Sequence, residues 1–358
     1  MKKNISALTA ISFATVLALS ACGGGGGGNG GNTTSSTPSV PAANPGNLQS
    51  SVPAATYTGG TAQASIFSQL NAYRTAMGVG QLKQDPVLDV SATAHALYLV
   101  TNFANGNITS TTHNEVSTFA DFYEVTPLSR ADKAGAPVTE WIGENVAVGL
   151  AQANASAFAS DCLGQYLNTV YHLQGATEVE ETIGTGFQQN TAQGTYSCVL
   201  DFGQTTGVSG TPAANGFLSS AGQQMATTAI AHSPLANETS VARAMVAEIP
   251  NPAPDFASPG RPIMVRVTAA NAGDVLTVSS FTLTSSGGTV VPARIIVPSA
   301  ALTGSSGATA DVNNEMAAGV AFLLPQAPLA ANTTYTVSFS GARTGTPIST
   351  TWSFTTGT

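Results

Sequence analysis

The chain has 358 residues, with 11 Lys and Arg against 19 Asp and Glu, so its formal net charge at pH 7 is −8. Charged residues make up only 8% of the chain, against about 25% in a typical soluble domain, while hydrophobic residues make up 42%. This composition excludes a nucleic-acid binder that works by charge and the highly charged class of disordered protein. The length fits about two domains.

The amino-terminal residues resemble the signal of a bacterial lipoprotein. Two lysines precede an uncharged apolar stretch over residues 5–19, which is too short to span a bilayer comfortably. The sequence Leu-Ser-Ala-Cys that ends at Cys22 resembles the lipobox, in which the cysteine becomes the lipidated first residue of the mature protein. We therefore predict a signal peptide over residues 1–21 and a membrane-anchored protein of the cell envelope, in the outer membrane if the source is Gram-negative. An ordinary cleaved signal with an incidental cysteine is the alternative.

The segment after the predicted anchor has the composition of a flexible spacer. A run of glycines over residues 23–28 opens a stretch of Gly, Asn, Ser, Thr, Pro and Ala. Such a stretch buries too little apolar area to offset the entropy lost on ordering. A phosphate-binding loop is excluded because no Gly-Lys-Ser/Thr follows the glycines. Residues 22–61 are therefore predicted to be a tether.

Two cysteines remain once Cys22 is assigned to the anchor. Cys162 and Cys198 would lie in a compartment that permits oxidation. A bridge between them would close a loop of about 37 residues and stabilise the fold by roughly 4 kcal/mol. Two free buried thiols are the alternative, and neither cysteine has the two-residue spacing of a redox or zinc site.

The first folded domain is predicted over residues 62–207, with several helices and few strands. Apolar residues recur at three- and four-residue steps over 66–77, which predicts an amphipathic helix. Asp85 followed by Pro86 is typical of a helix start, and this second helix is expected to end near residue 105. A third helix over 155–171 and strands over 182–188 and 194–202 complete a mixed α+β domain.

Motifs along this domain resemble the CAP superfamily of cysteine-rich secretory, antigen-five and pathogenesis-related proteins. The resemblance spans about 140 residues in consistent order and implies an α-β-α sandwich. Its parts are Leu-Asn-Ala-Tyr-Arg at 70–74, Asp-Pro-Val-Leu at 85–88, His113, the Thr-Pro to Ala-Gly stretch at 126–135, Gly-Glu-Asn-Val-Ala at 143–147, Ile-Gly-Thr-Gly at 183–186 and Asp-Phe-Gly at 201–203.

The resemblance also implies a cleft that holds two histidines and one or two glutamates. The matching residues here are His113, Glu144 and His172, which become candidates both for catalysis and for metal binding. Two imidazoles and a carboxylate suit zinc, the metal that some members hold, and would equally serve as a general acid and base. Thr169 stands where the family has its second glutamate, and the arginine after the second histidine is missing. A mainly structural Glu144 that bonds backbone amides is the alternative.

Other polar residues in this domain carry simpler expectations. His95 lies among alanines in a predicted helix and is expected to be a partly buried packing residue. The acidic cluster of Glu178, Glu180 and Glu181 is expected to be a solvated loop, because it lacks the spacing of a calcium-binding loop.

The composition shifts to Val, Thr, Ser, Gly and Pro after a linker over residues 208–225. The remaining domain, residues 226–358, resembles bacterial immunoglobulin-like envelope modules, which implies an all-β sandwich. Its strands are predicted over 263–269, 276–284, 293–297, 320–324, 334–340 and 350–356.

The expected function is that of an extracytoplasmic binding module. Its partners would be the membrane, through the anchor, and a small molecule, lipid, peptide or glycan in the CAP cleft, with no nucleic acid. A metal-assisted hydrolase of peptides or cell-wall material and an envelope adhesin that uses the second domain are the alternatives. Residues 62–207 hold 13 acidic and 4 basic side chains, which favours cationic or neutral ligands over polyanions.

Overall fold

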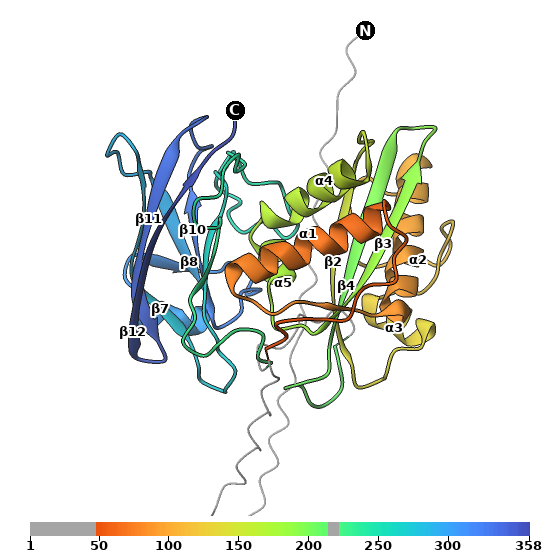
Figure 1. Ribbon diagram of the computed structural model, residues 1–358, viewed down its shortest axis with the longest axis horizontal. Coiled ribbons are helices and arrows are strands. Elements are labelled where there is room, and N and C mark those ends of the chain that lie inside the picture. The colour runs from red at the N-terminus through yellow and green to blue at the C-terminus, as the bar shows by residue number, and fades with distance from the viewer. Residues whose placement is uncertain (1–47, 214–221) are drawn as a thin grey trace, which may run out of the picture. The chain divides into compact units, whose positions relative to one another are not determined.

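The computed structural model describes residues 48–213 and 222–358, which belong to one compact unit of the chain (Figure 1). The predicted signal peptide, the predicted lipid anchor at Cys22, most of the predicted tether and part of the predicted linker lie outside the described residues. Among the helices that the structure describes, none is long and apolar enough to cross a membrane. We call residues 48–207 the N-terminal part and residues 222–358 the C-terminal part.

Both helices predicted at the start of this domain are present; the first begins four residues before the predicted range, and the second begins at the predicted Asp85-Pro86 signal. Helix α1 (Ala62–Met77) ends at Gly78, whose φ of 77° is a backbone conformation that favours glycine. Helix α2 (Pro86–Ala104) begins where the Asp85 carboxylate accepts hydrogen bonds from the backbone N–H groups of Val87 and Leu88. A third helix, α3 (Pro127–Ala134), starts in a reciprocal capping arrangement that was not predicted.

A four-stranded sheet lies at the centre of the N-terminal part. Its strands are β1 (Lys83–Gln84), β2 (Trp141–Leu150), β3 (Thr182–Asn190) and β4 (Thr195–Gln204), in the order β1-β3-β4-β2. The two predicted strands are therefore present as β3 and β4. Strand β2 was not predicted; it lies at the edge of the sheet and pairs antiparallel with β4 along its whole length.

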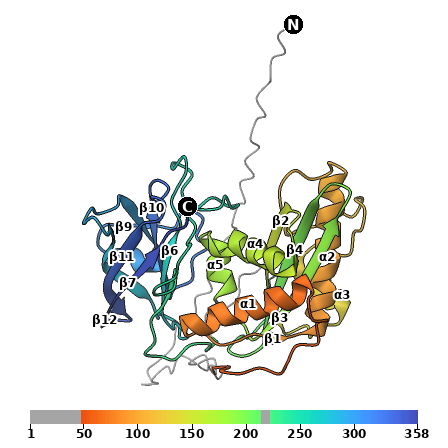
Figure 2. The same cartoon turned by 45° about the horizontal axis from the view of Figure 1, so that its top comes forward.

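Helices cover both faces of this sheet (Figure 2). Helix α2 packs on one face, where its alanines and leucines contact alternate residues of β2 and β4. Helices α1 and α4 (Ala155–Leu167) pack on the other face around an apolar cluster that includes Tyr166 and the disulfide. The Cys162–Cys198 bridge joins α4 to β4, which confirms the disulfide and excludes two free thiols.

The helix predicted over residues 155–171 is wrong, because the chain forms two helices there. Helix α4 ends at Leu167 with Asn168 as its C-cap, and the six-residue helix α5 (Tyr171–Ala176) begins after a short turn. The Asn168 amide and the Thr169 hydroxyl donate to carbonyls of the last turn of α4, at Gly164 and Tyr166. These local hydrogen bonds compete with continued helix and account for the break.

The C-terminal part is built from two β-sheets. The strands of the first, in the order β5-β6-β10-β8-β9, are β5 (Ala231–Ser233), β6 (Ile263–Arg266), β10 (Val320–Pro325), β8 (Ala293–Val297) and β9 (Ala308–Ala310). The second sheet, in the order β12-β11-β7, contains β12 (Thr346–Thr355), β11 (Thr334–Arg343) and β7 (Leu276–Ser285). A short 3₁₀ helix, η1 (Ser299–Gly304), lies between β8 and β9. Every strand predicted here is present, most with shifted ends, and apolar side chains from both sheets form one buried cluster. The α+β class is therefore confirmed.

The two parts share a second apolar cluster. Val170 and Leu173, beside and within α5, pack with Met264, Phe322 and Leu324 of the first C-terminal sheet. An ion pair reinforces this boundary, because the Arg266 guanidinium of β6 pairs with Glu178. Within the N-terminal part, the Arg74 guanidinium of α1 pairs with the nearby Glu180.

The prediction of a solvated acidic loop is wrong for two of its three residues. Glu178 and Glu180 are buried, and only Glu181 of the cluster is partly accessible. Buried carboxylates are tolerated where cations or hydrogen-bond donors compensate them, and here two arginines from distant elements do so.

Candidate functional site

Strand β2 organises the candidate site because its side chains alternate between the two faces of the sheet. Glu144 lies opposite Asp201 of β4, on the face that α2 covers. The next residue, Asn145, points to the other face and donates a hydrogen bond of 3.0 Å to the backbone carbonyl of His172. The edge strand thus contacts both predicted histidine regions at adjacent positions.

His113 and Glu144 form a hydrogen-bonded pair. The Nδ1 of His113 lies 2.9 Å from Oε1 of Glu144, and Oε2 of Glu144 accepts a 2.6 Å hydrogen bond from Arg130. Burial alone would raise the pKa of the Glu144 carboxyl, but the nearby Arg130 and His95 charges and the His113 hydrogen bond hold it well below its usual range. Glu144 is therefore ionised and accepts from Nδ1 of His113, and in the neutral ring Nε2 is then an acceptor.

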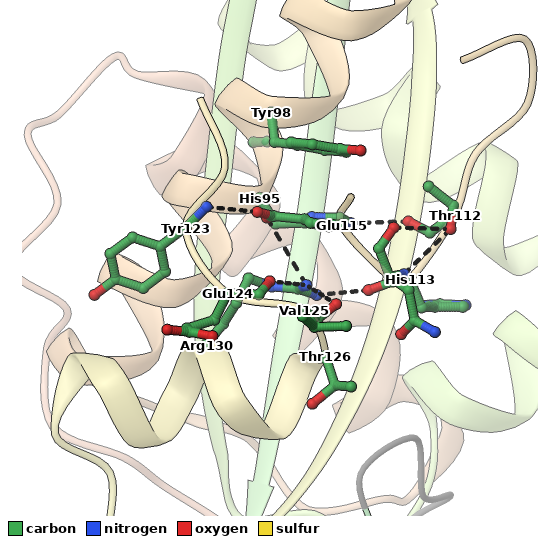
Figure 3. Close-up of polar contacts among 12 residues, drawn as sticks. His95, Tyr98, Thr112, His113, Glu115, Tyr123, Glu124, Val125, Thr126 and Arg130 are labelled. Atoms are coloured by element: carbon green, nitrogen blue, oxygen red, sulfur yellow. Dashed lines mark hydrogen bonds and ion pairs between the residues drawn. The ribbon is translucent and has the colours of Figure 1, made fainter. Parts of the chain in front are cut away.

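Arg130 and His95 extend this pair into a buried polar network (Figure 3). Arg130 also donates to the backbone carbonyl of His113 at 3.0 Å. His95 contacts Glu115 through Nδ1 at 2.9 Å and the carbonyl of Thr112 through Nε2 at 2.8 Å. The expectation for His95 was wrong: its side chain is fully buried and holds the loop that carries His113.

His172 contacts a different carboxylate, which belongs to the C-terminal part. Its Nδ1 lies 3.0 Å from Oε2 of Glu248. The same carboxylate accepts hydrogen bonds from the backbone N–H groups of Val170 at 2.6 Å and Tyr171 at 3.0 Å, at the start of α5. Glu248 is buried, and residue 246 donates a backbone hydrogen bond to Asn168. The C-terminal part therefore fixes the position of His172.

Thr169, which stands at the position of the second CAP glutamate, does not contact the cleft histidines as a carboxylate would. Its hydroxyl donates to the carbonyl of Tyr166, and the residue is buried. Glu248 supplies the second carboxylate beside a histidine instead. Sequence reasoning missed it because 76 residues separate Glu248 from His172 and no local pattern marks the contact.

Two adjoining pockets are lined by both histidines. The smaller, of about 150 Å³, is mostly apolar, and the larger, of about 590 Å³, has several hydroxyl and amide groups among its apolar walls. The His113 side chain is 41% exposed and the His172 side chain 16% exposed, so solvent reaches both imidazoles. Ile249 also lines both pockets. The histidines thus lie on one open cleft.

Glu144 does not bridge the two histidines. Both of its oxygens are engaged, one by His113 and one by Arg130. Within residues 48–213 and 222–358, no group of three or more His, Cys, Asp or Glu side chains is placed to share a metal ion. The three-residue zinc set stays a prediction of the sequence.

Asp201 adds a second acid beside Glu144. Its side chain is fully buried, and neither carboxyl oxygen has a hydrogen-bond partner in the described chain. Burial and the Glu144 charge raise the pKa of Asp201 well above its usual range. The pair therefore consists of one ionised carboxylate and one neutral acid. The sequence showed Asp201 only as part of a strand motif.

Comparison with known proteins assigns this chain to no family. No protein-family model matches the chain, and no curated protein matches it. Among solved structures, the chain is similar to an outer surface protein from Borrelia burgdorferi, with 18% identity and a TM-score of 0.30. The match covers 39% of this chain and 89% of that one. A likeness at this level assigns neither fold family nor function.

Proposed function

We propose that this chain is a lipid-anchored protein of the cell envelope that binds its ligand in the cleft of a CAP domain. The observation that carries the proposal is that His113 and His172, assigned to one cleft by the motif resemblance alone, line the same two solvent-open pockets. Helices on both faces of a four-stranded sheet agree with a CAP α-β-α sandwich, and the two packed sheets of the C-terminal part agree with an immunoglobulin-like module.

Binding is favoured over catalysis by the chemistry of the cleft. Glu144 is ionised and held by Arg130, and Asp201 is sealed inside the sheet–helix layer. Neither acid is free to exchange protons with a bound substrate as a general acid would. The two imidazoles keep Nε2 acceptors, which suit hydrogen bonding to a ligand.

A hydrolase is the second candidate, on one specific observation. Each histidine has its own carboxylate at Nδ1, an arrangement that orients the imidazole and directs Nε2 towards the cleft. If the cleft hydrolyses a ligand, His113 or His172 would accept a proton from water at Nε2. An adhesin that uses the C-terminal part alone is supported by no comparable site among the described residues.

A ligand screen separates these functions. Saturation-transfer NMR on the soluble chain from residue 23 onwards would test short peptides, oligosaccharides and amphiphiles. If the chain is a binding module, at least one class of ligand should bind without being converted to a product. The His113→Ala/His172→Ala double variant should not bind that class. New product signals that disappear in the double variant would favour the hydrolase. No response to any class would contradict both.

The anchor is tested separately. Cys22→Ser should release the protein from the membrane fraction, because acyl chains contribute about 0.8 kcal/mol per buried methylene and no other segment is expected to hold the chain there. Ser20→Ala, two residues away, is the matched control and should leave fractionation unchanged. Membrane retention of Cys22→Ser would contradict the lipid anchor.

A further inference from the structure

Helix α5 belongs to the N-terminal part by sequence, but two segments of the C-terminal part hold it. One segment carries Glu248, which accepts the backbone N–H groups at the start of the helix. The other, residues 311–317, follows β9 and precedes β10, and it contacts the side chains of Tyr171 and Gln174. His172 lies between these two side chains in the sequence, so a displacement of α5 would move its imidazole.

The Tyr171 hydroxyl is the first point of contact with residues 311–317. It donates a hydrogen bond to Oδ1 of Asp311 and accepts one of 2.9 Å from the side-chain amide of Asn313. Oδ2 of Asp311 accepts the backbone N–H groups of residues 315 and 316 at 2.6 and 3.1 Å. Tyr171 and Asp311 are both buried. One carboxylate therefore shapes its own loop with one oxygen and holds α5 with the other.

The Gln174 side chain is the second point of contact. Its amide nitrogen donates to the backbone carbonyl of Glu315 at 3.0 Å, and its amide oxygen accepts the backbone N–H of Ala317 at 2.8 Å. Two hydrogen bonds from one planar amide to one backbone segment fix both the distance and the orientation of the helix against that segment. Gln174 is buried, so water does not compete freely for these bonds.

The two histidines of the cleft are thus fixed by different parts of the chain. His113 is held by Glu144 and Arg130, within the N-terminal part. His172 is held at Nδ1 by Glu248, whose two oxygens also accept the backbone N–H groups that begin α5. Because this carboxylate acts as an acceptor, Nδ1 donates, and Nε2 of the neutral ring is an acceptor. The ring and the helix start share one carboxylate, so a displacement of α5 would disturb both contacts.

We propose that residues 311–317 are a positioning segment of the ligand cleft, and that Tyr171 and Gln174 are the positioning residues through which this segment fixes the His172 imidazole. The C-terminal part is then a component of the ligand site. The proposal rests on the proposed binding function and adds to it the segment that controls how His172 is presented to a ligand.

Tyr171→Phe tests the first contact because it removes only the hydroxyl. The measurement is a long-range ¹H–¹⁵N NMR spectrum of the histidine rings in the soluble chain from residue 23 onwards, at about pH 8.5, where an ordinary imidazole is neutral. In the wild type, His172 should show one tautomer, with the proton on Nδ1. In Tyr171→Phe, the ring ¹⁵N shifts of His172 should move towards those of a tautomer mixture.

Tyr57→Phe is the matched control. The Tyr57 hydroxyl also donates to a carboxylate, that of Asp89, at 2.6 Å, but both residues belong to the N-terminal part and line neither pocket. A general loss of stability would affect both variants, whereas a positioning role moves the His172 shifts in Tyr171→Phe alone. Equal ring shifts in the two variants would overturn the role of Tyr171.

Gln174→Ala tests the second contact. It should move the His172 ring shifts in the same direction, because α5 loses both hydrogen bonds of the amide to the C-terminal part. Gln165→Ala is its control, since the amide of Gln165 lines the larger pocket but bonds only Asp161 and Tyr196 of the N-terminal part. Wild-type ring shifts in Gln174→Ala would overturn the role of Gln174.

The combination of both changes tests the segment as a whole. Tyr171→Phe/Gln174→Ala should move the His172 ring shifts further than either single variant, and wild-type shifts in it would overturn the proposal. This measurement needs no ligand, so its outcome is separate from that of the ligand screen. If the ring shifts move as expected and the screen finds nothing, the positioning of His172 stands and the proposed binding function fails. If a ligand binds and the shifts stay unchanged, the reverse holds.

Discussion

The carboxylate of Glu248 lies 3.0 Å from Nδ1 of His172, so a residue of the C-terminal part holds a cleft histidine of the N-terminal part. The same carboxylate receives the backbone N–H groups that begin α5, which no side chain within that helix or its N-cap satisfies. Loss of this one side chain leaves several buried donors without partners.

Glu248→Ala should therefore lower the free energy of unfolding by about 3 kcal/mol. The check is urea denaturation at pH 7 followed by circular dichroism. Asp255→Ala is the matched control, since it removes a carboxylate from the same part of the chain whose only ion pair lies at the surface, and it should leave the unfolding curve unchanged. Equal behaviour of the two variants would contradict the role of Glu248.

Arg130→Met should cost about 3–5 kcal/mol of stability, because it leaves the Glu144 charge buried and unpaired. The double variant Arg130→Met/Glu144→Leu should be less destabilised than Arg130→Met alone, since it removes the charge as well. A double-mutant cycle by denaturation at pH 7 measures this coupling. Additive effects would show that the pair does not act as a unit.

Removal of the disulfide by Cys162→Ala/Cys198→Ala should lower stability by about 4 kcal/mol, because the bridge closes a loop of about 37 residues in the unfolded chain. Reduction of the wild-type protein with dithiothreitol should give a similar loss. The same reagent should not affect the double variant, and any effect there would point to another cause.

Stability should fall as the pH rises from about 4.5 to about 7, through Glu180. Burial raises the pKa of this carboxyl from 4.5 to about 7 despite its pair with Arg74 and the nearby Glu178 and Arg266 charges. In this range the folded state keeps a proton that the unfolded state has released, so the free energy of unfolding decreases with pH. The contribution of one such group is about 3 kcal/mol.

Glu180→Gln mimics the protonated form and should flatten this slope. The measurement is the denaturation free energy of both proteins at several pH values between 4.5 and 8. Because burial and the Asp85 charge also raise the pKa of Glu140 to about 7, a smaller slope should remain in the variant. Parallel curves for the wild type and Glu180→Gln would contradict the assignment.

The sequence predicted correctly those helices and strands whose positions depend on interactions between neighbouring residues. Asp85 and Pro86 marked the start of α2 correctly, and alternation in the C-terminal part marked its strands. The helix over 155–171 failed because side-chain hydrogen bonds at Asn168 and Thr169 break it, and these depend on geometry that periodicity does not show.

Charge pairing was the main feature that the sequence could not show. Glu178 and Glu180 looked like a solvated cluster, but tertiary contacts with Arg266 and Arg74 bury them. His95 was predicted to be a packing residue because its partners, Glu115 and Thr112, lie in a loop whose sequence has no regular pattern. The two histidines of the cleft were found because ordered motifs surround them, whereas Glu248 has no such motif.

The shared apolar cluster has a practical consequence for any shortened form of this protein. A fragment that ends at residue 207, where the composition changes, would expose Val170 and Leu173 to water and leave His172 without its carboxylate. Binding assays on that fragment would report on a cleft with one wall removed, and a negative result would say nothing of the whole chain. The boundary of a functional unit here follows the buried contacts and not the change in composition.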